Sequence, residues 1–297
     1  MIDRSKQAIR CARDALEWAA GQLGGTSEPG ISARLLLAHV LDCSTTDLFV
    51  HADRSLTVDQ RNRFGDLVSQ RAKHKPVAYL VGHREFFDLD LTIDERVLIP
   101  RPETELLVES VIEAAGKQPM RIADVGTGSG AIAVSLAVHL PEARIWATDV
   151  SAAALEVARE NARRYGVLSR IAFVQGDLLA PLQEPMDMIA ANLPYVSRAD
   201  YANLPPDIRL YEPRQALLSG DDGMDAIRAL LDQAPDHLAP RGTLWLEIGA
   251  DQGEAVLAAA ARAFPKAQST VIQDYAHLDR LLYISFACSN GFSRKKS

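Results

Sequence analysis

The sequence predicts an α/β protein, in which a mostly parallel sheet of seven strands follows a small helical bundle. Three observations support this fold class. From about residue 120 onward, short apolar runs alternate with helical patterns, as in a parallel sheet with crossover helices. A glycine-rich turn, Gly126-Thr127-Gly128-Ser129-Gly130, follows the first of these runs. Residues 3–74, in contrast, carry apolar side chains at helical spacing only.

The composition is that of an ordinary globular protein of one large or two smaller domains. The 297 residues are 47% hydrophobic and carry a net charge of −7, which argues against a broad nucleic-acid-binding face. Neither a membrane-spanning run nor a signal core is present, so we expect a cytoplasmic protein with no membrane partner. Three separated cysteines, Cys11, Cys43 and Cys288, indicate reduced thiols. The seven histidines form no ligand pattern, and we predict no metal site.

Residues 1–75 are predicted to form the helical bundle. A first helix ends at Gly24, a second begins near Ser32, a short third piece covers 47–50, and Thr57 caps a fourth. The bundle contains no catalytic constellation. Its basic residues are typical of a solvent-exposed face. The more specific, functional hypothesis is that the bundle binds a macromolecular partner.

Residues 76–100 are predicted to link the two domains. Two runs with alternating polarity, 86–91 and 92–98, predict short strands. Because they are adjacent along the chain, we expect them to form a hairpin.

The α/β domain is predicted to span residues 101–297. Its first stretch is Arg101-Pro102-Glu103-Thr104-Glu105. Proline fits the first turn of a helix and acidic side chains stabilise its positive end, so this stretch predicts a helix start. Arg101 and Glu103 are interpreted either as capping residues or as residues that lie beside a cofactor.

Apolar runs then predict the strands of the sheet, at 121–125, 143–148, 171–174, 186–191, 243–248, 268–274 and 279–286. Helical patterns lie between them, at 131–140, 152–162, 222–233 and 253–263. A long loop, 196–220, follows the fourth strand, and residues 293–297 predict a frayed basic tail.

The glycine-rich turn predicts a cofactor cradle, because it exposes backbone amides at a helix start. The spacing of its glycines does not decide which cofactor binds. Gly126, Gly128 and Ala131 satisfy the dinucleotide pattern Gly-x-Gly-x-x-Ala, whereas Gly126, Gly128 and Gly130 satisfy the Gly-x-Gly-x-Gly of methyltransferases. Asp149 ends the second strand and can accept both ribose hydroxyls in either case.

Other features favour S-adenosyl-L-methionine over NAD. Asp177 follows the third strand, where it can accept the adenine amine, with Leu178 beside the ring. Together with Asp124 and Asp149, it gives three successive strands that end in an acidic residue. Further along the sequence, no His or Lys lies in a pattern typical of the base of a hydride-transfer site, as an NAD-dependent enzyme would need.

The fourth strand ends in Asn192-Leu193-Pro194-Tyr195. Pro194 cannot continue the strand ladder and holds Leu193 extended. The Asn192 side-chain oxygen and the Leu193 carbonyl can then form a fixed pair of acceptors, with the flat face of Tyr195 beside them. Such a pair suits a planar NH2 group, either a carboxamide or the amine of a base.

These motifs resemble those of the bacterial peptide chain release factor glutamine methyltransferases. The resemblance covers residues 79–282 and is most specific in the Arg101–Glu105 run; further matching pieces are 79–86, 124–133, 211–223, 246–253 and 274–280. It implies a class I S-adenosylmethionine-dependent methyltransferase with a Rossmann-like sheet. It also implies methyl transfer to the glutamine side-chain amide in the Gly-Gly-Gln loop of class I release factors.

The resemblance, together with the strand-end pattern, gives the expected site. The residues that we expect to bind the cofactor are Arg101, Glu103, Asp124, Gly126, Thr127, Gly128, Ser129, Gly130, Asp149, Asp177, Leu178 and Asn192. The residues that we expect to bind the substrate and carry catalysis are Asn192, Leu193, Pro194 and Tyr195. We expect a monomer that binds release factors through its helical bundle.

The tetrapeptide departs from the family at one position, because the family usually has Pro where this chain has Leu193. Asn-Leu-Pro-Tyr also resembles the tetrapeptide of rRNA adenine dimethylases, which leaves an N6-adenine methyltransferase acting on RNA or DNA as an alternative. The acidic net charge argues against a nucleic acid substrate. Two more alternatives are a glutamine methyltransferase for a ribosomal protein and a cofactor-binding module without catalysis.

Overall fold

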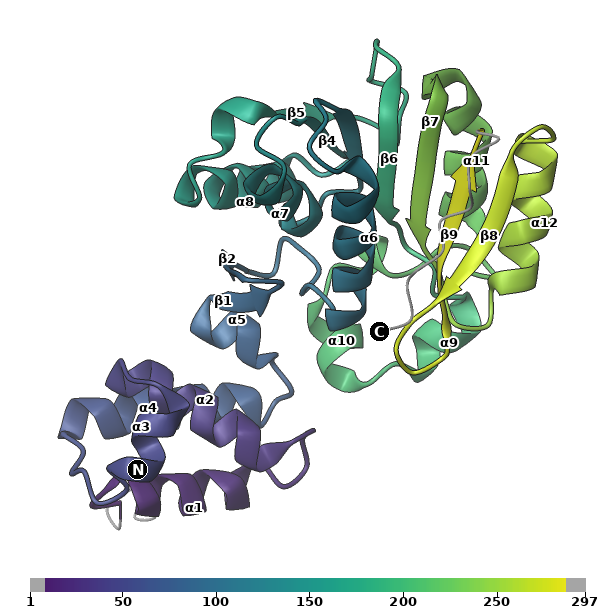
Figure 1. Cartoon of the computed structure of the whole chain (residues 1–297). Coiled ribbons are helices and arrows are strands. Elements are labelled where there is room, and N and C mark those ends of the chain that lie inside the picture. The colour runs from purple at the N-terminus through teal and green to yellow at the C-terminus, as the bar shows by residue number, and fades with distance from the viewer. Residues whose placement is uncertain (1–8, 287–297) are drawn as a thin grey trace. The chain divides into compact units, whose positions relative to one another are not determined.

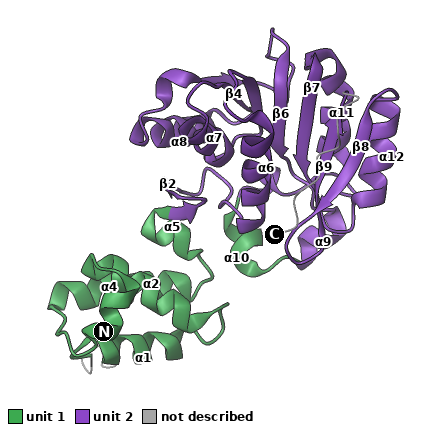
Figure 2. Ribbon diagram, viewed as in Figure 1, with its two compact units in different colours: residues 1–83, 204–212 green, residues 84–203, 213–297 purple. Residues whose placement is uncertain are grey.

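The computed structural model describes residues 9–286, so Cys288 and the basic tail lie outside the described residues. The chain forms two compact units (Figures 1 and 2). One contains the residues up to 83 together with 204–212, and the other contains 84–203 and the residues from 213 onward. The boundary thus falls at residue 83 rather than at 75, and the predicted linker 76–100 is divided between the units.

The helical unit is built around an apolar core. Its helices are α1 (Ala12–Gln22), α2 (Pro29–Leu41), α3 (Thr45–Val50), α4 (Val58–Arg71), α5 (Val77–Val81) and α10 (Pro206–Tyr211). Phe64, Leu36 and Leu37 are fully buried among them. Thr57 caps α4 by accepting the Gln60 amide hydrogen, as predicted, whereas α2 begins at Pro29, before Ser32.

Helix α10 belongs to the helical unit although it lies in the long segment 196–220, for which the sequence predicted only a loop. The buried guanidinium of Arg71 lies 3.6 Å from the Asp207 carboxylate at the start of α10. At its end, the Tyr211 hydroxyl donates to the Lys73 carbonyl at 2.8 Å. These contacts hold the returning segment to the end of α4.

A hairpin forms earlier in the chain than predicted, as β1 (His83–Phe86) and β2 (Leu89–Thr92), with its turn inside the predicted first strand 86–91. Residues 93–98 form no strand, so the prediction of a second strand over 92–98 was wrong. The buried Asn161 side chain accepts the Thr92 amide hydrogen at 2.7 Å and donates to its carbonyl at 3.0 Å. This side-chain pairing takes the place of a longer ladder.

The second unit contains a seven-stranded sheet in the order β5-β4-β3-β6-β7-β9-β8. Its strands are β3 (Arg121–Val125), β4 (Arg144–Asp149), β5 (Ile171–Gln175), β6 (Met186–Asn192), β7 (Leu238–Glu247), β8 (Gln268–Gln273) and β9 (Asp279–Ser285). All neighbours are parallel except that β9 runs antiparallel to β7 and β8. The predicted mostly parallel sheet of seven strands is confirmed.

Helices cover both faces of this sheet (Figure 1). They are α6 (Glu105–Ala115), α7 (Ala131–His139), α8 (Ala152–Arg164), α11 (Asp225–His237) and α12 (Gly253–Ala263), with the short α9 (Arg198–Asn203) beyond β6. Ala123 and Val125 of β3 face the core that α11 and α12 cover. Asp124, between them in the strand, faces α7 instead, because it accepts the Ala133 amide hydrogen at 3.0 Å.

The strand order reverses between β3 and β6. Chain connections leave in opposite directions there, which opens a crevice at the carboxyl ends of the strands. Val125 and Ala191 are paired at those ends, so the glycine-rich turn and the tetrapeptide leave the sheet side by side. Within residues 9–286, every helix is too short or too polar to cross a lipid bilayer.

Candidate active site

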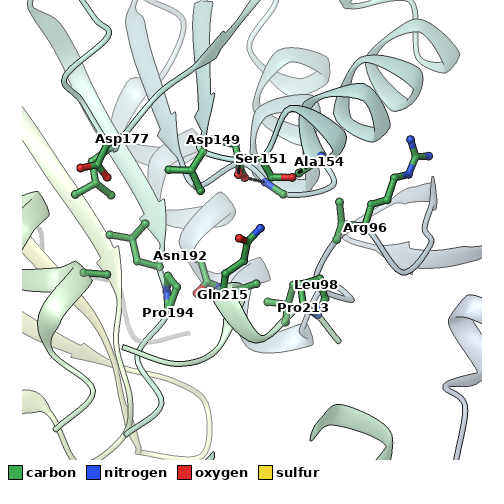
Figure 3. Close-up of a pocket in the computed structure, with 18 of the residues that line it drawn as sticks. Arg96, Leu98, Asp149, Ser151, Ala154, Asp177, Asn192, Pro194, Pro213 and Gln215 are labelled. Atoms are coloured by element: carbon green, nitrogen blue, oxygen red, sulfur yellow. Dashed lines mark hydrogen bonds between the residues drawn. The ribbon is translucent and has the colours of Figure 1, made fainter. Parts of the chain in front are cut away.

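A pocket lies at this switch point, between the carboxyl ends of β3, β4, β5 and β6 (Figure 3). Eight of the predicted site residues line it: Gly126, Gly128, Asp149, Asp177, Leu178, Asn192, Leu193 and Pro194. Leu98 and Gln215, from segments that the sequence analysis did not assign to the site, also line this pocket (Figure 3). The parallel sheet therefore brings together residues that are as far apart in sequence as 126 and 194.

The glycine-rich turn is held close to the neighbouring strands. Gly126, Gly128 and Gly130 all have positive φ, at 74°, 55° and 81°, a region that side chains disfavour. A Cβ on Gly130 would also lie 3.0 Å from the Ala158 Cβ. The Gly126 and Thr127 amides donate to the Thr148 carbonyl, both at 2.9 Å. Because no side chain stands in the way at these glycines, a ligand can come close to the backbone of the turn.

Asp124 lies beneath the turn and not in the pocket wall. Its carboxylate accepts the Thr127 hydroxyl hydrogen at 2.6 Å and the Ala133 amide hydrogen at 3.0 Å. Burial raises the pKa of this carboxyl to about 7. Asp124 therefore fixes the turn against the start of α7, and the buried Thr127, Ser129 and Gly130 likewise do not line the pocket.

Asp149 and Asp177 do lie in the pocket wall, at neighbouring strand ends (Figure 3). One Asp149 oxygen accepts the Gly128 amide hydrogen and the other accepts that of Ser151, both at 2.9 Å. Each oxygen keeps a lone pair for another donor. The pocket thus offers a fixed carboxylate beside the glycine-rich turn and a second one, Asp177, next to the apolar Leu178.

The tetrapeptide is fixed from both sides. The Leu193 side chain is buried, with its Cδ2 3.0 Å from the point where a Cβ on Gly126 would lie. The Gln252 side chain donates to the Tyr195 carbonyl at 3.0 Å. A Cβ on Gly223 would lie only 2.3 Å from the same carbonyl oxygen. The backbone that leaves β6 therefore has little freedom.

Asn192 is oriented by a neighbour that the sequence analysis placed at a helix start. Its side-chain Nδ2 donates to the Thr104 hydroxyl at 2.8 Å. The amide oxygen consequently points away from Thr104. Since Asn192 lines the pocket, this oxygen is the polar atom of the side chain that remains available there.

Glu247 is a further residue that the sequence analysis did not assign to the site. It is paired with Asn192 across β6 and β7, it is fully buried, and its Oε1 accepts the Tyr195 hydroxyl hydrogen at 3.4 Å. Its Oε2 makes no hydrogen bond with the described residues. Burial raises the pKa of Glu247 to about 7 and that of Tyr195 well above its usual value. The signal in the sequence was a carboxylate at the end of the apolar run Leu244-Trp245-Leu246.

Arg101 and Glu103 are not in this pocket. Arg101 lines a smaller adjoining pocket together with Tyr195, and its charge offsets a small part of the rise that burial causes in the pKa of that phenol. Glu103 is exposed and lines neither pocket. Within residues 9–286, no group of three acidic, histidine or cysteine side chains is placed to hold a metal ion.

The fold and the site together define a methyltransferase. Residues 102–204 match the family model described as "Methyltransferase small domain". The hMettl16 catalytic domain, solved in complex with the MAT2A 3′UTR hairpin 6, has the same fold: it covers 75% of this chain and 82% of its own, with a TM-score of 0.55 and 19% identity.

Two further comparisons are more specific. Residues 14–82 match the model "PrmC N-terminal domain". The release factor glutamine methyltransferase of Moorella thermoacetica is 46% identical over 274 residues, which are 90% of this chain and 96% of that protein. The one of Xylella fastidiosa (strain Temecula1) is 46% identical over 76% of this chain and 82% of that protein. The chain therefore belongs to the release factor glutamine methyltransferase family and is an enzyme.

Proposed function

We propose that this enzyme transfers a methyl group from S-adenosyl-L-methionine to the side-chain amide nitrogen of the glutamine in the Gly-Gly-Gln loop of class I release factors. The observation that carries the proposal is the Asn192 side chain, held with its oxygen free at a strand end. Similarity to enzymes of that name over nine tenths of the chain supports the choice of substrate.

The pocket has the groups that S-adenosylmethionine requires. The Asp149 carboxylate has acceptor capacity for the two ribose hydroxyls, and Asp177 with Leu178 suits the adenine amine and ring. The glycine-rich turn leaves room for the amino acid part. When bound, S-adenosylmethionine supplies an electrophilic methyl group.

The tetrapeptide provides what a glutamine amide needs in order to react. An amide nitrogen is a poor nucleophile because its lone pair is delocalised into the carbonyl. Asn192 Oδ1 and the Leu193 carbonyl would accept its two hydrogens, which aims the lone pair and stabilises the positive charge that develops on nitrogen. The Tyr195 ring would pack against the amide plane. No charged base is required, since the proton can leave after transfer.

The charges around the pocket favour a protein substrate over a nucleic acid. Arg96 lines the pocket, but its guanidinium is paired with Asp94 at 2.6 Å and with Glu156 at 3.2 Å. Asp149 and Asp177 lie in the same wall. Phosphate groups bind to clustered unpaired cations, so this wall suits a polynucleotide poorly.

The remaining assignments belong to the same proposal. The helical unit would bind the release factor away from its glutamine loop. The enzyme would act as a monomer, and in the cytoplasm, where translation terminates.

The test uses purified enzyme with S-adenosylmethionine labelled in its methyl group. A recombinant class I release factor, its Gln→Ala loop variant, a ribosomal protein fraction and total rRNA are offered separately. We expect label on the release factor and none on the variant. Label on rRNA alone, or on a ribosomal protein alone, would replace this substrate with one of the alternatives.

A further inference from the structure

We propose that Arg214 and Gln215 form a docking rim beside the active site, which binds the main chain of the protein substrate next to its acceptor glutamine. The inference rests on the proposed function and deepens it, because it assigns a surface that selects the substrate before methyl transfer. Both residues lie on η4 (Arg214–Ala216), a short 3-10 helix in the segment that follows the tetrapeptide.

The rim is continuous with the pocket. Pro213 and Gln215 line the pocket at the switch point. The same two residues also line a shallow depression outside it, together with Arg214 and Leu218. Figure 3 shows the Gln215 side chain pointing from η4 into the pocket. A polypeptide that places one side chain in the pocket would therefore have its main chain over this depression.

The backbone fixes the rim relative to the tetrapeptide. Val196 directly follows the tetrapeptide, and its amide donates to the Leu217 carbonyl at 2.9 Å. Its carbonyl accepts the Ser219 amide hydrogen, also at 2.9 Å. The Leu218 amide in turn donates to the Arg214 carbonyl at 3.0 Å. The rim and the acceptor pair are thus held at a set spacing before a substrate binds, which favours affinity.

The two side chains of the rim keep their hydrogen-bonding capacity for a partner. Both are exposed, and within residues 9–286 the Arg214 guanidinium makes no ion pair and the Gln215 amide makes no hydrogen bond. The Arg214 Cζ lies 5.5 Å from the centre of the Tyr201 ring. This stacking orients the guanidinium while its N–H groups stay available. The rim therefore offers fixed donors beside a carboxamide that both donates and accepts.

A peptide main chain is the partner that these groups fit. In the Gly-Gly-Gln loop of the proposed substrate, the two residues before the acceptor have no side chains, so only their peptide groups can be recognised. The Gln215 carboxamide matches a peptide group, because each carries a donor and an acceptor. Arg214 can donate to a carbonyl further along the loop. A polynucleotide would require several unpaired cations, and the rim has one.

The first test uses Arg214, which lines the outer depression and not the pocket. Arg214→Ala should raise KM for the release factor about tenfold, because a charge-assisted hydrogen bond to the main chain is lost, and should change kcat less than about twofold. The affinity for S-adenosylmethionine, measured by titration calorimetry, should stay within about twofold. Arg144→Ala is the matched control, since it removes an exposed arginine at the start of β4, at the opposite edge of the sheet. An unchanged KM, or an equal rise in the control, would overturn the role of Arg214.

The second test separates a role of Gln215 in the rim from one at the cofactor, since this residue also lines the pocket. Gln215→Ala should raise KM for the release factor about fivefold, and Gln215→Glu should do the same, because a carboxylate keeps the shape but loses both donors. Gln118→Ala, which removes an exposed glutamine before β3, is the control. The affinity for S-adenosylmethionine should again stay within about twofold. A loss of cofactor affinity as large as the rise in KM would assign Gln215 to the cofactor and overturn its place in the rim.

The identity of the methylated acceptor distinguishes this inference from the proposed function. If the release factor is methylated with the same KM by the wild type and by both alanine variants of the rim, the rim is refuted and the proposed function stands. If the acceptor is another polypeptide and both variants raise its KM, the substrate proposal fails and the rim stands. An unchanged KM for that polypeptide, or methylation of rRNA alone, would overturn both.

Discussion

The Gly128 amide donates to the Asp149 carboxylate at 2.9 Å, and this bond joins the glycine-rich turn after β3 to the end of β4. The same carboxylate holds the start of α8 through the Ser151 amide. One side chain therefore fixes two walls of the pocket before any ligand binds. A ligand that bonds to Asp149 meets a group that needs no reorganisation, which favours affinity.

Asp149→Ala should weaken S-adenosylmethionine binding by about 30-fold or more, because the two charge-assisted hydrogen bonds that we propose between this carboxylate and the ribose would be lost. Titration calorimetry with the cofactor measures the change. Asp187→Ala is a matched control, since Asp187 also accepts a backbone amide hydrogen, from Arg121, but at the start of β3. Equal losses in the two variants would show that the effect is on the sheet and not on the pocket.

Gly223→Ala should lower kcat by at least about tenfold, because its Cβ would lie 2.3 Å from the Tyr195 carbonyl and displace the tetrapeptide. Gly166→Ala shares the positive φ and has nothing within 4 Å of its added Cβ, so it carries the backbone strain alone. Steady-state kinetics and thermal unfolding of both variants separate strain from displacement. Similar kcat values for the two would contradict a fixed tetrapeptide.

Leu193→Ala should destabilise the fold by about 2–3 kcal/mol, because a buried side chain is removed beside Gly126. Its kcat should fall less than about fivefold, because the proposed acceptor at this position is the backbone carbonyl. Denaturant unfolding and methyl-transfer assays measure the two effects. A large loss of kcat at preserved stability would instead give the side chain a direct role, and the unusual residue at this position a functional meaning.

Stability should fall as pH rises, since the pKa of buried Asp124 is raised from an ordinary value of 3.8 to about 7. The folded state then holds a proton that the unfolded chain releases, so this stabilisation is complete below pH 3.8 and is lost as pH rises toward about 7. Between about pH 5 and 8, the free energy of unfolding should therefore fall by about 3 kcal/mol through this residue. Asp124→Asn should flatten the pH dependence of the unfolding free energy. An unchanged slope would contradict the raised pKa.

The sheet could be predicted because its strands are short apolar runs and its ligand-facing residues follow them directly. Asp149, Asp177 and Asn192 are local signals of this kind, and the structure brings all three into one pocket. The hairpin was placed too far along the chain because its second strand is completed by the Asn161 side chain, a contact 69 residues away.

The rest depends on contacts between distant segments, which no local pattern encodes. Thr104 looks like an ordinary helix-start residue until β6 brings Asn192 within 2.8 Å of it. In the sequence, Glu247 is an ordinary residue at the end of a strand. Only the structure shows that its carboxyl group is fully buried. Helix α10 joins the helical unit only through partners such as Arg71 and Lys73, more than 130 residues earlier in the chain.

The measurement that tests the central claim most directly is the single-turnover rate of methyl transfer to the release factor by Asn192→Ala, at saturating cofactor. If the Asn192 oxygen holds the substrate amide, the rate should fall by about 100-fold or more. The affinity for S-adenosylmethionine, measured in parallel, should change less than about fivefold. A rate within about fivefold of the wild type would contradict the proposal that the strand-end oxygens prepare the glutamine nitrogen for transfer.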